Sequence, residues 1–159
     1  MEKKRLQEYA ARVSQSNRSE LVVVIYEVIL KSIEEGKALL EAGKVEEARA
    51  ETARARGMIT ELMSSLDMQY TISHYLRQLY IYAYHEICHA IAERKPELFD
   101  HASDIFNSLL PSFEEVAKQD TSEPVMQNTQ QIFAGLTYGK GSLHETIGVG
   151  LSPKRGFEA

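Results

Sequence analysis

The sequence lacks the features by which a chain is cross-linked, anchored in a membrane or secreted. Its single cysteine, Cys88, excludes an internal disulfide and fits a reducing compartment. Residues 1–13 contain no apolar stretch of signal-peptide length, and no later stretch approaches the ~18 apolar residues of a membrane span. We therefore expect a cytoplasmic protein without a membrane span.

Tryptophan is also absent, and proline occurs at only four positions. Residues that favour helices occur throughout the chain, and this composition is typical of an all-α protein. At 159 residues the chain is long enough to form one domain around a single core.

The charged residues are of both signs and well mixed. The net charge of −5 comes from 23 acidic and 18 basic residues. Only Lys3, Lys4 and Arg5 form a basic cluster, which is too short for the electrostatic footprint of a nucleic-acid-binding protein. We expect no nucleic-acid partner.

The most apolar stretch covers residues 21–30 and carries one charge, Glu27. Its apolar side chains extend past the single face that an ordinary amphipathic helix buries. One interpretation is a helix buried on several sides. The other is a helix with one face in the core and another held for a partner peptide. The pattern alone leaves both interpretations open.

Apolar residues at helical spacing predict four long helices joined by short loops. Asn17, with Glu20 three residues later, has the pattern of a capping box at the start of the first long helix. Pro111 is expected to bend the last one. The predicted spans are residues 18–41, 45–66, 72–93 and 98–116.

Four such helices predict an antiparallel up-down-up-down four-helix bundle. A short N-terminal helix on Leu6, Tyr9 and Val13 precedes it. We expect the bundle domain over residues 1–120, a short C-terminal helical extension over 121–138 and a flexible tail over 139–159. The extension could cover a partner-binding groove or brace the back of the bundle.

The predicted third long helix carries an unusual number of tyrosines. A core cannot readily bury four tyrosines from one helix with every hydroxyl hydrogen-bonded, so we expect some of them to face a groove or water. The four are Tyr75, Tyr80, Tyr82 and Tyr84.

Residues 85–89 read His-Glu-Ile-Cys-His, the H-E-x-x-H pattern of zinc-dependent hydrolases. A catalytic zinc site needs a third protein ligand, and no recognised motif surrounds the candidates His101, Asp104 and Glu114. If Ile87 faces the core, His85 and His89 point outward. We therefore favour surface histidines without a cofactor. An exposed pair that binds a metal ion without catalysis stays an alternative, as does a zinc hydrolase.

Several stretches carry a likeness to a known family. Residues 20–27 join Glu20-Leu21, an apolar run and Tyr26-Glu27, residues 59–68 read ITELMSSLDM, and residues 79–82 read LYIY. Together with residues 130–145, they resemble the FliS family of flagellin-specific export chaperones. Arg18, Ile81 and Phe113 depart from the residues usual in that family.

The resemblance implies a helical bundle that binds the disordered C-terminal segment of flagellin, prevents its premature polymerisation and delivers it to an export-gate component. It implies no catalytic activity. A helical self-association module, with a weak homodimer, is the other alternative. The client-binding residues implied at matching positions are Leu21, Ile25, Tyr26, Leu62, Leu66, Tyr80 and Tyr82.

Overall fold

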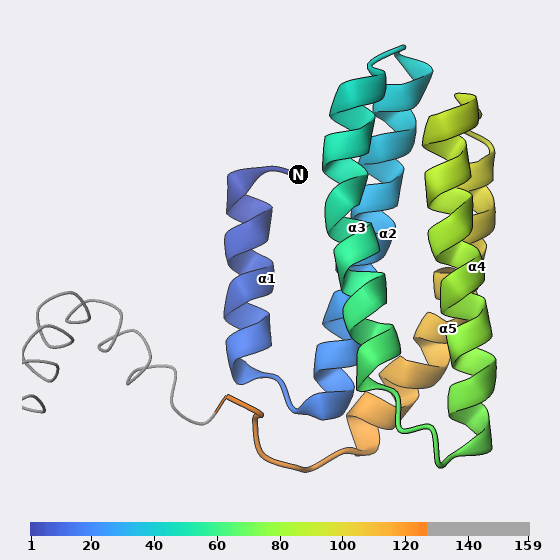
Figure 1. Ribbon diagram of the computed structural model, residues 1–159. Coiled ribbons are helices and arrows are strands. Elements are labelled where there is room, and N and C mark those ends of the chain that lie inside the picture. The colour runs from blue at the N-terminus through green and yellow to red at the C-terminus, as the bar shows by residue number, and fades with distance from the viewer. Residues whose placement is uncertain (127–159) are drawn as a thin grey trace, which may run out of the picture. The chain divides into compact units, whose positions relative to one another are not determined.

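The computed structural model describes residues 1–126, and no strand occurs among them (Figure 1). The predicted all-α class is confirmed. Five helices lie within the compact unit Met1–Val125. They are α1 (Lys3–Gln15), α2 (Arg18–Glu41), α3 (Val45–Ser65), α4 (Thr71–Glu93) and α5 (Leu98–Gln119).

Helices α2 to α5 form the bundle, each running antiparallel to the one before it (Figure 1). Helix α2 packs on α3 and α5, and α4 packs on the same two neighbours. Helix α1 lies outside this ring against α2 and buries none of its own residues completely. Within residues 1–126, no helix is long and apolar enough to cross a membrane.

The predicted start of α2 is confirmed by a complete capping box. The Asn17 side chain accepts a hydrogen bond from the Glu20 N–H at 2.9 Å, and the Asn17 N–H donates to the Glu20 carboxylate at 3.0 Å. The helix ends before Gly43, whose φ of 75° a residue with a side chain rarely adopts. These local signals explain why the predicted limits of α2 agree with the structure.

The apolar run 21–30 is covered on several sides because α1, α3 and α5 all pack on α2. Five of its ten residues are buried, namely Val23, Val24, Tyr26, Val28 and Ile29, and the other five are half-buried. Leu21 and Ile25, at the start of the run, are only half-buried.

The core is centred on four aromatic residues from three helices. The hydroxyls of Tyr26 (α2) and Tyr80 (α4) lie 2.5 Å apart and satisfy each other. The ring of Phe106 stacks on Tyr80 with 6.1 Å between centroids, and Phe113 meets the Tyr26 ring edge at 5.2 Å.

Pro111 lies inside α5, which continues to Gln119, beyond the predicted Val116. The helix starts beside α4 and crosses to the start of α2 at its other end (Figure 1). There Asn17 donates to the Asp120 carbonyl at 3.1 Å, and the Ser19 hydroxyl donates to the Asp120 carboxylate at 2.5 Å. Hydrogen bonds from Ser122 and Ser19 lower the pKa of Asp120 to about 2.

The chain then returns to the junction of α1 and α2, where the Val125 N–H donates to the Ser16 carbonyl at 3.1 Å. Beyond its first residues, the predicted C-terminal extension lies outside the described part of the chain, as does the predicted flexible tail.

Candidate interaction surface

Helix α4 is poor in charge, although charged residues make up 26% of the whole chain. Its only charged side chains belong to Arg77, Glu86 and Glu93. Helix α3, of similar length, carries seven Arg and Glu side chains. The low charge of α4 is therefore a property of this helix and not of the chain as a whole.

Six exposed residues of α4 recur at spacings of three and four, which places them on one side of the helix. We call this set the α4 face. Tyr75 is 60% exposed, Tyr82 47% and Ile81 39%. Three large apolar or aromatic side chains exposed on one side of a helix make this side a candidate interaction site. The α4 face consists of Tyr75, Gln78, Ile81, Tyr82, His85 and His89.

The exposed apolar surface continues into the α3–α4 connection. Met68, Tyr70 and Ile72 are 38%, 63% and 61% exposed. We call these three residues the turn cluster. Because α4 begins at Thr71, the turn cluster adjoins the first turn of that helix and extends the apolar surface to the end of the bundle.

A small open pocket of about 140 Å³ lies between α3 and α4 beside the α4 face. Thr60, Met63 and Tyr84 line it together with Ile81 and His85. It is smaller than the ≈ 300–1,000 Å³ typical of small-molecule sites. Its size and apolar lining suit an apolar side chain of a partner better than a free ligand.

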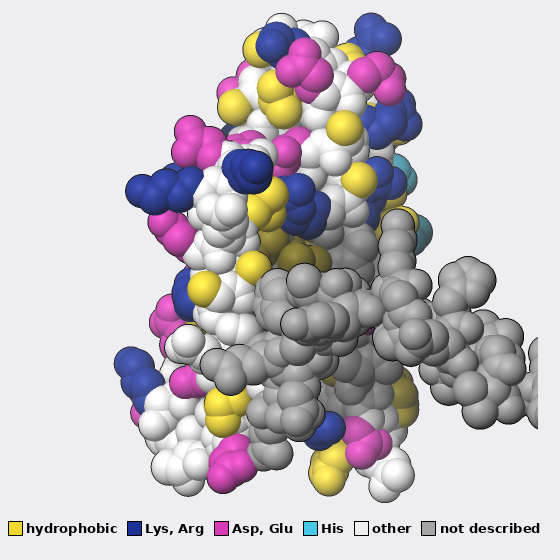
Figure 2. Space-filling model, turned by 90° about the vertical axis from the view of Figure 1, so that its left-hand side faces the viewer, with side chains coloured by type: hydrophobic (Ala, Val, Ile, Leu, Met, Phe, Trp, Pro, Cys, Tyr) yellow, Lys and Arg dark blue, Asp and Glu magenta, His cyan; other side chains and the backbone are white. Residues whose placement is uncertain are grey.

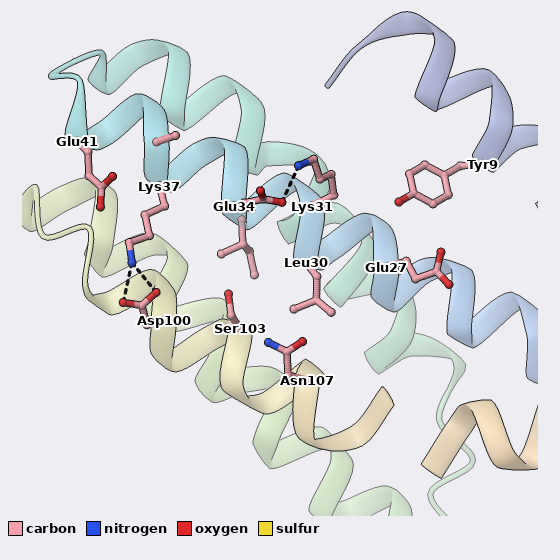
Figure 3. Close-up of a pocket in the computed structure, with 12 residues that line it drawn as sticks. Tyr9, Glu27, Leu30, Lys31, Glu34, Lys37, Glu41, Asp100, Ser103 and Asn107 are labelled. Atoms are coloured by element: carbon pink, nitrogen blue, oxygen red, sulfur yellow. Dashed lines mark hydrogen bonds and ion pairs between the residues drawn. The ribbon is translucent and has the colours of Figure 1, made fainter. Parts of the chain in front are cut away.

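A larger groove, of about 720 Å³, lies between α2 and α5 with Tyr9 of α1 at its rim (Figure 3). Its walls are charged, but the charges are paired. Lys37 contacts Asp100 at 2.7 Å, and Lys31 contacts Glu34 at 2.6 Å. This groove therefore combines paired charges with apolar side chains such as Leu30 and Ile33.

A second groove, of about 630 Å³, opens between α1, α2 and the end of α5. Glu27 lines both grooves and pairs with Arg12 of α1. On this side of the molecule, basic and acidic side chains are interspersed over the described surface (Figure 2). Neither groove matches the uncharged character of the α4 face.

The seven residues carried over from the family likeness occupy three kinds of position. Tyr82 is exposed on the α4 face. Leu21, Ile25 and Leu66 are half-buried where α2 begins and α3 ends. The remaining three, Tyr26, Leu62 and Tyr80, are core residues with exposures of 0%, 4% and 1%.

From the sequence, Ile81 stood out only as a departure from the family pattern, and neither Ile81 nor the turn cluster was predicted to be exposed. The unusual number of tyrosines was a correct signal, because Tyr75 and Tyr82 are exposed while Tyr80 is buried. A second signal was available in the near absence of charged residues along α4, and it would have identified the whole face.

The H-E-x-x-H pattern lies on α4 as predicted, with His85 and His89 exposed and Ile87 in the core. Glu86 turns toward α5, where its carboxylate contacts His101 Nδ1 at 2.6 Å. Across residues 1–126, no three His, Cys, Asp or Glu side chains are grouped so that they could hold a metal ion. The described residues therefore offer no third ligand of the kind that a catalytic zinc requires.

The fold and this surface define a helical-bundle protein with an exposed apolar face suited to binding a segment of another polypeptide. The family model of the flagellar protein FliS matches residues 1–120. The chain therefore belongs to the FliS family, a family of flagellar export chaperones and not of enzymes. No curated protein matches the chain well enough to serve as a named relative.

Proposed function

We propose that the protein is a cytoplasmic export chaperone that binds the disordered C-terminal segment of flagellin. Binding keeps the segment from polymerising prematurely and allows its delivery to an export-gate component. The observation that carries the proposal is the α4 face, a partly apolar surface without Lys, Arg, Asp or Glu on a chain that is 26% charged.

The α4 face is long enough to hold a partner helix of several turns. Tyr75 and His89 are separated by 14 residues of helix, which corresponds to about 21 Å at 1.5 Å per residue. A disordered client must overcome its ordering entropy when it binds, and a long apolar surface provides the compensating burial. The turn cluster lengthens this surface.

The carried-over residues then have two roles in this proposal. Tyr82 contacts the client directly, and half-buried Leu21, Ile25 and Leu66 contribute where the client reaches the end of the bundle. The buried residues Tyr26, Leu62 and Tyr80 support the surface from beneath by fixing how α2, α3 and α4 pack.

Tyrosine suits a surface that is exposed when empty and buried when occupied. Its ring contributes apolar contact area while its hydroxyl stays hydrated or bonds to a client backbone group. Tyr75 and Tyr82 combine both properties, so the free protein tolerates their exposure.

Site-specific photo-crosslinking tests the location of the site. A benzophenone amino acid at position 82 should crosslink to flagellin and not to flagellin that lacks its C-terminal segment. The matched control is position 107 of α5, which lines the α2–α5 groove (Figure 3). Crosslinking from position 107 with none from position 82 would assign the client to the groove. Crosslinking between two copies of the chain would favour the self-association module.

A further inference from the structure

Two imidazoles of the α4 face are placed to act together. His85 and His89 lie one helical turn apart, both are exposed, and their ring centroids are 6.1 Å apart. No hydrogen bond within residues 1–126 engages either ring. Both rings can therefore turn a nitrogen toward a common point in solvent.

The neighbouring carboxylates are already engaged. Glu86 contacts His101, and Glu93, one turn after His89, contacts Lys95 at 2.7 Å. Any ion held by the two imidazoles would keep its remaining coordination positions open to water. Such an arrangement can bind a metal without being a catalytic centre.

Histidines four residues apart on a helix can share one metal ion, as in the zinc-binding helix of H-E-x-x-H enzymes. Imidazole nitrogen suits Cu²⁺, Ni²⁺ and Zn²⁺, and the affinity of a given site is greatest for Cu²⁺. We propose that His85 and His89 form a two-histidine site for a divalent transition-metal ion on the α4 face.

The two-histidine site lies on the same α4 face to which we assign the client, so a bound metal ion affects client binding. Ile81 lies one turn before His85, and Tyr82 lies between them. A hydrated divalent ion here places charge and water at the C-terminal end of the α4 face, next to Ile81 and Tyr82. Metal and client therefore oppose each other's binding, and this coupling is reciprocal. This second step rests on the proposed function, whereas the metal site does not.

Calorimetric titration of the full, chelator-treated chain with Cu²⁺ and with Zn²⁺ tests the site. We expect one site, tighter for Cu²⁺, and a melting temperature that rises with added metal because the folded state binds it. His85→Ala and His89→Ala should each weaken binding at least tenfold and abolish the rise. The matched control is His74→Ala, an exposed histidine of α4 whose Nε2 contacts the Met68 carbonyl at 3.1 Å.

Unchanged affinity in the double variant His85→Ala/His89→Ala would overturn the metal site, as would the absence of binding at millimolar metal. Unchanged affinity in His74→Ala supports the assignment to the pair. Binding that His74→Ala also abolishes would contradict it.

The coupling is measured with a flagellin C-terminal peptide in the presence and absence of saturating Zn²⁺. We expect weaker peptide binding with Zn²⁺ in the wild type and no effect of Zn²⁺ in the double variant. Metal binding with unchanged peptide affinity would overturn the coupling and leave the site in place. Peptide binding without any metal binding would overturn the site and leave the chaperone function in place.

Discussion

Among single residues, Gly36 sets how closely α2 can approach α3. A Cβ added there would lie 2.2 Å from Thr52 Cγ2. Thr52 is fully buried and its hydroxyl donates to the Ala48 carbonyl at 2.8 Å, so its side chain cannot easily turn away. Gly36→Ala should destabilise the protein by roughly 1–3 kcal/mol through overpacking, despite the better helix propensity of alanine.

Denaturant unfolding measures this loss, and Gly57→Ala is the matched control. Gly57 lies on the exposed side of α3, and an added Cβ meets no atom within 4 Å. Its replacement should stabilise the protein by about 0.4–1 kcal/mol. Equal changes in the free energy of unfolding for the two substitutions would show that α2 and α3 do not pack tightly at Gly36.

The paired hydroxyls of Tyr26 and Tyr80 give a second residue-level prediction. Tyr26→Phe leaves the buried Tyr80 hydroxyl without its partner, which should cost about 1–3 kcal/mol. Tyr26→Phe/Tyr80→Phe removes both groups and should recover much of that loss. A double-mutant cycle by denaturant unfolding measures the coupling, and additive single effects would contradict it.

The same pair predicts how stability depends on alkaline pH. Burial and the contact with Tyr80 raise the pKa of Tyr26, and burial raises the pKa of Tyr80. The unfolded chain therefore releases these protons first, and stability present below about pH 10 is lost as the pH rises further. The double phenylalanine variant should lose less stability between pH 9 and pH 11 than the wild type, and an identical loss would contradict this account.

At the scale of elements, α1 is the least firmly held. It has no fully buried residue, and its contacts with α2 include ion pairs from Arg12 to Glu27 and from Arg5 to Glu35. Exposed ion pairs contribute at most about 1 kcal/mol each and weaken in salt. We expect the amides of α1 to exchange through local opening, well before those of α3.

Hydrogen-exchange mass spectrometry with and without 1 M salt tests this prediction. Salt and Arg12→Ala should each speed exchange in α1 and leave α3 unchanged. Exchange of α1 as slow as that of α3 would show that α1 unfolds only together with the bundle.

The helices themselves were largely predictable from the sequence, since their signals are local. Asn17 and Glu20 mark the start of α2, and Gly43 marks the turn after it. The passage of α5 through Pro111 was predicted as well, whereas its continuation from Val116 to Gln119 was not. Tertiary contacts of Phe106 and Phe113 on either side of the proline keep both halves of that helix in the core.

The proposed client-binding residues were harder to assign, because a family likeness gives matching positions but not whether the side chains there are buried or exposed. Tyr26 lies on a helix with neighbours on three sides, and its apolar flanks do not reveal which face meets the core. Tyr80 and Tyr82 are two residues apart and point to opposite environments. Only the packing of α4 against α3 and α5 shows that Tyr80 is buried and that Tyr82 is exposed.

On the scale of the whole molecule, charge is distributed unevenly between surfaces. The α1 side carries interspersed charges of both signs, and two ion pairs, Lys37 with Asp100 and Lys31 with Glu34, line the α2–α5 groove (Figures 2 and 3). The α4 face and the turn cluster carry apolar and uncharged polar side chains instead. Binding there should depend on apolar burial, with a negative heat-capacity change and little response to salt.

The most direct test of this account is calorimetric titration of a flagellin C-terminal peptide at several temperatures, using the wild type and two variants. Ile81→Ala removes apolar surface from the α4 face. Val125→Ala is the matched control, since Val125 is 52% exposed and its N–H donates to the Ser16 carbonyl at the junction of α1 and α2.

The account predicts a negative heat-capacity change for the wild type. It also predicts weaker binding with a smaller heat-capacity change for Ile81→Ala, and wild-type values for Val125→Ala. Equal affinity in all three proteins, or an affinity that falls steeply with salt, would contradict the assignment of the client to the α4 face.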